Sequence, residues 1–377
     1  MRKLTILVCI ILIGISVHSQ KWENIIGLPG KKAAVMNLLE HYDHGYLITS
    51  TLRSGSGANT YWEGWLVKTD INGQIRWDKK INSIWPDQVI LSNSICDQQG
   101  NMYVFGCLLQ DQPHEFPLIV KLNACGDLQW CRLLAIEGYD YGFFNDAIFL
   151  DNGDMLGLAY MPEDDPSNNN RIILFRISPE GDLIWKKGYA TYENHPYYGD
   201  PYGASIHQFG DIYMIVGNVY SPYPNSPNPY HVYQRPMFIF INEDFEEQWI
   251  VEFGINDSLL GRAETVVPIN DTLFMGVGRY RFVNENGLID QSAWLMFFND
   301  KGEEAGNKIL TDEQFGPEVL ESDLYEAEHI EGDKYLLSAG YFNSNIDDFN
   351  KGDLVADTAG NVYNYTIREN TSGGGGI

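Results

Sequence analysis

Two carboxylates, Asp146 and Glu264, are the residues of this chain best suited to catalysis. Each stands seven residues before a turn residue, Gly153 or Asp271, inside a stretch that reads as a β-strand. Polar groups in the middle of a strand should face water or a ligand. Paired carboxylates could serve as acid and base, or as acid and nucleophile, in the cleavage of a glycosidic bond. A water-filled channel whose polar lining is merely solvated is the simpler interpretation, and we favour it.

The same position is polar in most copies of a repeated pattern described below. We expect it to form a row along a central channel, made of Leu38, Asn93, Asp146, Gly203, Glu264 and Tyr325.

A second set of candidates is aromatic and suits binding rather than catalysis. Two insertions, 189–203 and 218–236, are rich in Tyr, Asn and Pro. Tyrosine between prolines offers a preordered surface with a polar tip, which suits a glycan or a peptide. The candidate ligand-binding residues are Tyr197, Tyr198, Tyr202, Tyr220, Tyr223, Tyr230 and Tyr233. Loops that pack their own tyrosines over a sheet edge are the alternative.

Other site chemistries leave no signature in the sequence. The histidines, including His195, His207, His231 and His329, show no metal-ligand spacing, and there is no D-x-D-x-D-G calcium loop. No G-x-S-x-G elbow occurs, and the segment "TSGGGG" at 371–376 follows no strand–helix pattern. We therefore predict neither a metal site nor a cofactor.

Charge and the N-terminal segment limit the partners. The chain has 25 Lys and Arg against 51 Asp and Glu, a net charge of −26, which repels nucleic acid and anionic membranes. Arg2 and Lys3 precede an apolar run from Leu4 to Ile15, too short for a bilayer core of about 30 Å. We predict a signal peptide at 1–19, no membrane span, and a secreted, monomeric protein.

An internal repeat indicates the elements that position these residues. "LVKTDINGQIRW" at 66–77 returns as "IVKLNACGDLQW" at 119–130 and as "LFRISPEGDLIW" at 174–185. A second phrase, such as "GNMYVFG" at 100–106, accompanies it, and together they define six units of roughly 53–64 residues. Each unit reads as four short strands joined by Gly, Asn and Asp turns. This predicts an all-β fold, a β-propeller of six four-stranded antiparallel blades, with seven blades as the alternative.

A tryptophan recurs in the fourth strand of the units. We expect its ring to wedge against the neighbouring blade, since one ligand-stacking residue per unit would serve no single site. The structural set is Trp22, Trp77, Trp130, Trp185 and Trp249. Trp22 has no three strands before it, so it either completes the sixth blade or belongs to a seventh.

These motifs resemble two kinds of propeller. The Gly-x-x-x-Trp spacing resembles the tryptophan-docking motif of quinoprotein-like propellers, although Asp70, three residues before Gly73, departs from that family's Asp-x-x-Thr-Gly. Signal peptide, repeats and hairpins together are more similar to secreted propeller-repeat proteins of the type IX (Por) pathway, over residues 22–365. The resemblance implies fold and export, and no activity. We expect a propeller domain at 20–368 and a flexible Gly-rich tail at 369–377. The resemblance implies a C-terminal sorting domain, and a truncated gene product is one explanation for its absence.

Three functions fit this architecture. The longest insertions share one face, the long-loop face, formed by the connections from second to third strands and from blade to blade. We favour a non-enzymatic binding module that holds a glycan, peptide or surface protein there. A carbohydrate-active hydrolase or lyase using Asp146 and Glu264 is the second possibility. A purely structural repeat module of a larger secreted protein is the third.

Four cysteines remain after the signal peptide, all in the second unit: Cys96, Cys107, Cys125 and Cys131. Strand pairing places Cys107, Ile119 and Cys131 in one row, so Cys107 and Cys131 lie two strands apart, about 9.6 Å. This exceeds the reach of a disulfide. We predict unpaired thiols that pack as small apolar residues.

Overall fold

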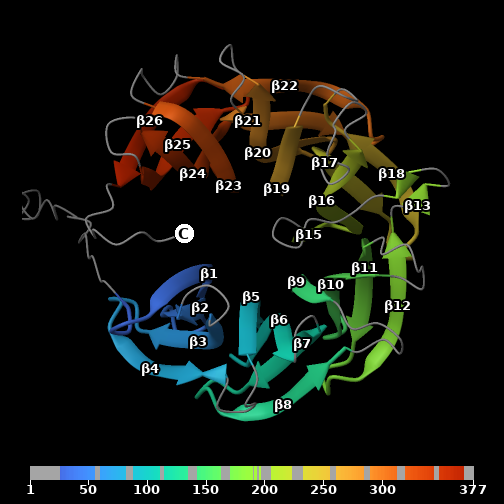
Figure 1. Cartoon of the computed structure of the whole chain (residues 1–377). Coiled ribbons are helices and arrows are strands. Elements are labelled where there is room, and N and C mark those ends of the chain that lie inside the picture. Colours follow the sequence, from blue (N-terminus) through green and yellow to red (C-terminus); the bar gives the residue numbers. More distant parts are fainter. Residues whose placement is uncertain are drawn as a thin grey trace, which may run out of the picture.

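Four consecutive strands in every repeat pair into one antiparallel sheet in the computed structural model of the chain. Six such sheets surround a central channel, which confirms the predicted six-bladed propeller (Figure 1). The structure describes residues 26–55, 60–81, 88–110, 114–134, 142–162, 170–189, 191–192, 195–196, 205–222, 232–254, 260–283, 289–311, 319–343 and 348–368.

The strands of the first three blades run from the channel outward in chain order. Blade 1 consists of β1 (Lys32–Glu40), β2 (Tyr46–Ser54), β3 (Tyr61–Thr69) and β4 (Ile75–Lys80). Blade 2 consists of β5 (Gln88–Cys96), β6 (Met102–Gln110), β7 (His114–Leu122) and β8 (Leu128–Leu133). Blade 3 consists of β9 (Phe143–Phe149), β10 (Met155–Pro162), β11 (Asn170–Ile177) and β12 (Leu183–Tyr189).

The other three blades follow the same order. A two-stranded ribbon, β13 (Thr191–Tyr192) and β14 (His195–Pro196), precedes blade 4, which consists of β15 (Ser205–Phe209), β16 (Ile212–Pro222), β17 (Val232–Ile241) and β18 (Glu247–Glu252). Blade 5 consists of β19 (Leu260–Asn270), β20 (Leu273–Val283), β21 (Ile289–Asn299) and β22 (Glu304–Leu310). Blade 6 consists of β23 (Val319–Glu331), β24 (Lys334–Asn343), β25 (Asp348–Asp357) and β26 (Val362–Arg368).

The turn between the third and fourth strands explains which residues recur in the repeated sequence motif. In blade 1 the carboxylate of Asp70 accepts hydrogen bonds from the backbone N–H groups of Asn72 and Gln74, both at 2.9 Å. Gly73 has a φ of 73°, which favours glycine. A side-chain acceptor at the first position and a glycine three residues later therefore define this tight turn.

The fourth strand of each of the first four blades lays a tryptophan over this turn in the next blade. Trp77 lies over Gly126, and Trp249 over Gly302, so closely that an added Cβ would meet the rings at 2.9 and 2.7 Å. Trp130 covers Gly181 and donates from Nε1 to the Pro179 carbonyl at 3.3 Å. At the remaining junction Trp185 packs on Phe245, with ring centroids 5.0 Å apart.

In the first three blades a basic residue two positions after the tryptophan makes a second contact with the same turn, whereas blade 4 has Val251 there. Lys79 donates to the Gly126 carbonyl at 2.6 Å, and Arg132 donates to the Gly181 carbonyl at 3.2 Å. Lys187 donates to the Phe245 carbonyl at 3.0 Å. Trp-x-Lys/Arg is thus the docking unit, and sequence reasoning recognised only its first member.

The sixth blade supplies its own fourth strand, because β26 pairs with β25. The sheet of blade 6 therefore does not need an N-terminal strand to be complete. Trp22 lies outside the described residues.

The four thiols of blade 2 are free, as predicted, but only Cys107 is buried in the core, and Cys125, which lies in a turn, is exposed. The register behind that prediction was wrong by two residues, because Cys107 pairs with Pro117 rather than Ile119. The connection between β6 and β7 covers only 111–113, and a shorter loop moves every partner toward it. Cys131 pairs with Val120 in the next ladder.

Candidate functional site

β-bulges in the inner strands decide which side chains line the channel. A register shift occurs in β1, β5, β9, β19 and β23, and such a shift turns one residue away from the regular alternation. Matching each inner strand to its partner strand gives one equivalent position per blade: Asn37, Asn93, Asp146, Ser205, Thr265 and Glu326. Glu264 and Tyr325 are bulged residues one step earlier, and Leu38 lies one step later. Gly203 lies outside the described residues, and the other five members of the row counted from the turns occupy three different positions.

Asp146 joins three blades. Its Oδ1 accepts from the Asn93 amide of blade 2 at 2.6 Å and from the Ala147 N–H at 2.8 Å. Its Oδ2 accepts from the Ile206 N–H of blade 4 at 2.9 Å. Burial raises the pKa of Asp146 to about 6, and these hydrogen bonds oppose the rise. The Asp146 carboxylate therefore links blades 2, 3 and 4 by hydrogen bonds.

Glu264 has a different environment. It forms an ion pair with Arg262 on its own strand. Burial raises its pKa to about 7, while Arg262 lowers it and the nearby charge of Asp323 raises it. The partners of Asp146 and those of Glu264 belong to different junctions, so the structure does not join the two as a pair.

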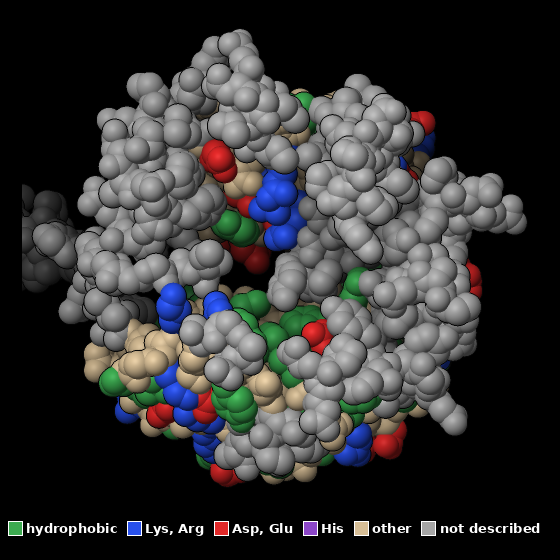
Figure 2. All heavy atoms as spheres, in the orientation of Figure 1, with side chains coloured by type: hydrophobic (Ala, Val, Ile, Leu, Met, Phe, Trp, Pro, Cys, Tyr) green, Lys and Arg blue, Asp and Glu red, His purple; other side chains and the backbone are tan. Residues whose placement is uncertain are grey.

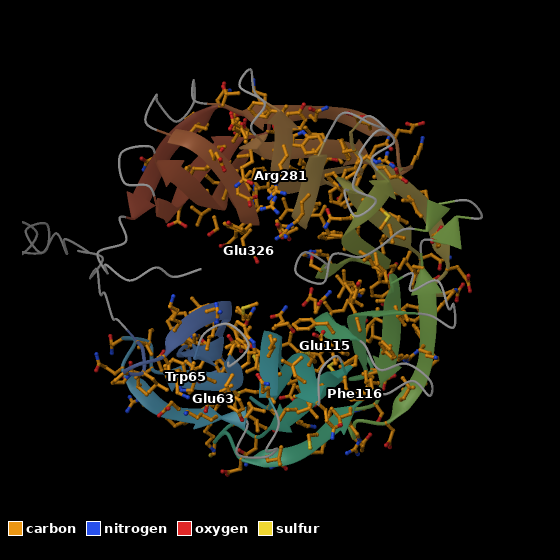
Figure 3. The ribbon with its side chains drawn as sticks, viewed as in Figure 1. Glu63, Trp65, Glu115, Phe116, Arg281 and Glu326 are labelled. Carbon is orange, nitrogen blue, oxygen red and sulfur yellow. The ribbon has the colours of Figure 1, made fainter. Side chains whose placement is uncertain are left out.

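Glu326 of β23 is a channel residue that sequence reasoning missed (Figure 3). Its side chain is open to the channel, yet the surrounding protein and then the charge of Asp146 raise its pKa. Glu326 occupies the position of Asp146 in its own blade, which a count from the paired second strand would have revealed. The charge of Asp146 thus acts on Glu326, as the charge of Asp323 acts on Glu264.

Three arginines gather at the long-loop end of the channel. Arg262, near the start of β19, is directly opposite Arg279 of β20, and Arg281 follows two residues along the same face. Basic side chains are visible in the wall of the central opening (Figure 2). Like charges directly opposite on neighbouring strands are unfavourable unless something offsets them. Arg279 has such an offset, since it donates to Asp323 of blade 6 at 2.9 Å.

Arg281 differs from its two neighbours. Within the described part of the chain it forms no ion pair, and Nε donates weakly to the Gln291 side-chain oxygen at 3.4 Å. Burial and the charges of Arg279 and Arg262 lower its pKa, while Asp323 and Glu321 oppose this. Its guanidinium is half-buried and keeps donors available at the channel mouth.

His207 is a structural residue of the channel wall. Its Nε2 lies 2.9 Å from the Ser205 hydroxyl and 3.2 Å from the Thr265 hydroxyl. Burial lowers its pKa to about 4, so the ring is neutral at pH 7. The Ser205 hydroxyl also donates to the Glu264 carbonyl at 3.1 Å, which ties blade 4 to blade 5.

Five of the seven tyrosine candidates fall on segments that the structure does not describe. Tyr197, Tyr198, Tyr202, Tyr223 and Tyr230 lie outside the described residues. Tyr220 and Tyr233 belong to β16 and β17, where pairing with Gln234 and Ser221 places their backbone.

The described residues include no group of three or more His, Cys, Asp or Glu arranged to bind a metal ion. They also hold no helix with the length and apolar character that crossing a membrane requires.

The known proteins that resemble this chain are solved structures of low sequence identity. No family model matches the chain, and no curated protein matches its sequence. A chain from the complex of Drosophila Plexin A with Semaphorin 1b is 9% identical at a TM-score of 0.47, covering 92% of this chain and 80% of that chain. The β-propeller domain of the Trilobed protease from Pyrococcus furiosus is 8% identical at 0.41, covering 89% and 95%. A mutant of B. megaterium levansucrase is 8% identical at 0.41, covering 75% and 85%. At such identities none of them carries a functional argument.

Proposed function

We propose that this protein is an exported, non-enzymatic propeller that binds a glycan, peptide or surface protein through its long-loop face. One contrast at the channel supports the proposal. Asp146 and Glu264 are engaged within the fold, whereas Arg281 keeps donors free at the end of the channel where the long loops emerge. The sequence resemblance to type IX cargo supports export to the medium or the cell surface.

The arginines also restrict the ligand. A guanidinium presents a planar fork that matches a carboxylate. The net charge of −26 repels polyanions, so a ligand with an isolated acidic group in an otherwise neutral chain fits best. A glycan that carries an occasional uronic acid has this chemistry.

The test is a glycan array of neutral and uronate-containing polysaccharides, with hydrolysis assays on the same polymers. We expect binding without product release, and weaker binding of uronate-containing glycans by Arg281→Ala. Arg76→Ala removes an exposed arginine near the opposite, tight-turn face and serves as the matched control. Equal binding by wild type and Arg281→Ala would refute the role of Arg281.

The interaction between Asp146 and Glu326 favours one second candidate, a hydrolase. Acid and base roles require carboxyl groups with separated pKa values, and burial and then the charge of Asp146 raise the pKa of Glu326. In that case wild type releases reducing ends from a polysaccharide and Glu326→Gln does not. Absence of products with every polymer that binds would leave the binding module as the function.

A further inference from the structure

A cavity of about 650 Å³ opens on the tight-turn face, opposite the long loops, between blades 2 and 3. Its walls come from the turn between β5 and β6 at 97–101 and the turn between β9 and β10 at 150–154. Lys121, Tyr103 and Phe149 form its inner side. This volume lies within the usual range of small-molecule sites.

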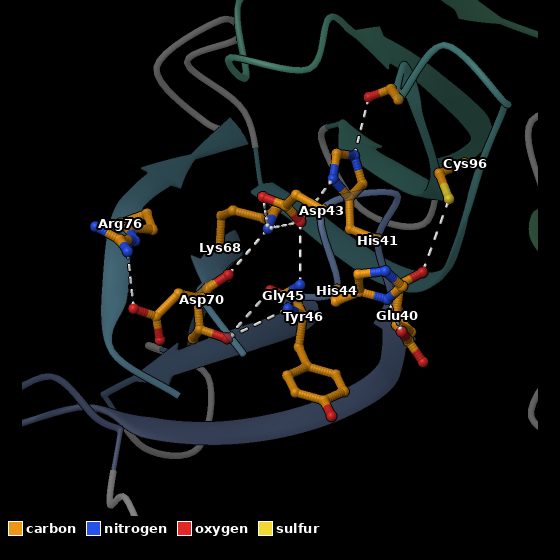
Figure 4. A network of polar contacts seen from close by, with 12 residues as sticks. Glu40, His41, Asp43, His44, Gly45, Tyr46, Lys68, Asp70, Arg76 and Cys96 are labelled. Carbon is orange, nitrogen blue, oxygen red and sulfur yellow. Dashed lines mark hydrogen bonds and ion pairs between the residues drawn. The ribbon is translucent and has the colours of Figure 1, made fainter. Parts of the chain in front are cut away.

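The equivalent space between blades 1 and 2 is filled. There Nε2 of the buried His41 lies 2.9 Å from the Gly100 carbonyl oxygen, and the Tyr42 ring covers Gly100. Lys68 donates from Nζ to both carboxylate oxygens of Asp43, at 2.7 and 2.9 Å, and so fixes the turn at 41–45 (Figure 4). The turns of neighbouring blades can therefore pack closely in this fold. Those of blades 2 and 3 do not, and the cavity lies between them.

Some polar side chains of the cavity are already hydrogen-bonded within the protein, and others are available to a ligand. Asp97 accepts from the N–H groups of Gln99 and Asn101 at 3.0 and 2.8 Å, and its second oxygen accepts from the Asn101 amide at 2.8 Å. Among the described residues, the side-chain amides of Gln98 and Gln99 take part in no hydrogen bond, and both are exposed. Each offers one acceptor and two donors.

An aromatic floor completes the cavity. Tyr103 and Phe149 meet edge to face with centroids 5.1 Å apart. Lys121 places Nζ 4.9 Å from the Tyr103 ring centroid and donates to the Pro179 carbonyl at 3.1 Å. Tyr103 is only 3% exposed, so it is the half-buried Phe149 ring that offers an apolar surface for C–H groups, next to the amides that can bind hydroxyls.

We propose that this cavity binds a short neutral saccharide. Sugar hydroxyls both donate and accept, as carboxamides do, and sugar C–H faces suit an aromatic ring. The ionisable lining groups are Asp97, Asp151 and Lys121, with Cys96 and Tyr103 neutral, so the cavity carries a slight negative charge that disfavours anions. This separates it from the arginines at the long-loop end, and it does not depend on the proposed function there.

The experiment titrates maltotriose, cellotriose and triacetylchitotriose separately into the mature protein by calorimetry. We expect one of them to bind wild type and to bind a Gln98→Ala/Gln99→Ala variant about tenfold more weakly, the effect of two lost hydrogen bonds. Gln74→Ala removes an exposed amide from another turn on the same face and should bind as wild type does. Arg281→Ala should also leave this binding unchanged. No binding of any trisaccharide at millimolar concentration, or equal binding by the double variant, overturns the proposal.

Discussion

At the residue scale, polar side chains in this ring serve first to satisfy the backbone of the next blade. A bulge interrupts the ladder of an inner strand and leaves an N–H group without its strand partner. Thr51 accepts from the Leu91 N–H at 2.9 Å, and Asn218 accepts from the Ala263 N–H at 3.1 Å. Asp146 also accepts from a backbone N–H of the next blade, that of Ile206, although β15 has no bulge. A charged residue beside the channel is therefore no sufficient sign of catalysis.

Glu264 predicts a pH-dependent stability. Its pKa rises from 4.5 in a free chain to about 7 in the folded protein, so folding tightens its hold on the proton. This contribution to stability is present below pH 4.5 and is lost as the pH rises to about 7. We expect the stability of wild type relative to Glu264→Gln to fall by about 1–3 kcal/mol between pH 5 and pH 8.

The comparison with the Gln variant isolates this group, because His207 acts in the opposite direction in both proteins. The pKa of His207 falls from 6.5 to about 4, so its contribution grows as the pH rises across that interval. Urea unfolding at both pH values gives the measurement. A relative stability that increases with pH would show that Arg262 keeps Glu264 ionised.

The cysteines should differ in reactivity. Cys125 is exposed, Cys96 and Cys131 are half-buried, and Cys107 is buried. Burial raises the pKa of the Cys107 thiol well above its usual value, so little thiolate is present for attack. Without reductant, we expect Ellman's reagent to modify Cys125 first and Cys107 only after denaturation. Fewer than four thiols in the denatured mature protein would reveal a disulfide and contradict the free state.

At the scale of elements, sequence reasoning recovered what local chemistry determines. The Asp/Asn-x-x-Gly turn and the tryptophan four residues after its glycine are local signals, and they predicted the strand order of the blades. The bulges have no such signal, because one extra residue in a strand changes no motif. Glu326 was missed for this reason, and Leu38 was counted into a row where Asn37 belongs. Loop length caused the other error, the pairing of Cys107.

Trp130 tests the docking unit. Its ring lies on Gly181 and meets Tyr103 edge to face at 5.9 Å. Because the ring is half-buried, Trp130→Ala should cost about 3 kcal/mol, the lower end for loss of a large aromatic side chain. Leu128→Ala changes an exposed residue of the same strand and should cost less than about 0.5 kcal/mol. Denaturation midpoints give both values, and equal midpoints for the two variants would exclude docking by Trp130.

The insertion at 218–236 in blade 4 includes strand residues, so a variant that tests this loop must replace a shorter segment. A deletion of 220–235 would remove the ends of β16 and β17, which extend to Pro222 and begin again at Val232. Replacing only 223–231 with a short Gly-Ser turn keeps that ladder. Changes in surface-loop length cost little free energy, so we expect an unfolding midpoint close to wild type and loss of glycan-array binding. Retained binding would exclude this loop from the proposed site.

At the scale of the whole molecule, the junction between blade 6 and blade 1 differs from the others. Val35 and Leu38 of β1 are 56% and 61% exposed. The residues that match Val35 in four other inner strands are fully buried, namely Leu91, Phe144, Ala263 and Leu324. On blade 6, Glu326 takes the position that faces the next blade. The ring therefore closes without the apolar contact between inner strands that joins its other blades.

Closure should instead depend on the outer part of blade 1. Ile26 packs against the cluster of Leu52, Trp65 and Val67. It follows Trp22 by four residues, as the buried Leu134 follows Trp130. Fifty-one residues separate Trp22 from Gly73, the same interval as between Trp130 and Gly181. By this equivalence we predict that Trp22 lies over the Gly73 turn.

The corresponding substitution tests how the ring is held together. Trp22→Ala in the mature protein should lower stability by about 3 kcal/mol, as at Trp130, because it removes the outer contact at the one junction that lacks an inner one. Trp22→Phe keeps a ring over the turn and should recover more than half of that loss. Limited proteolysis should cut the Ala variant earlier than wild type, since blades 1 and 6 would then separate more often. If Trp22→Ala unfolds at the wild-type midpoint, the N-terminal segment does not close the ring, and blades 1 and 6 are held by other contacts.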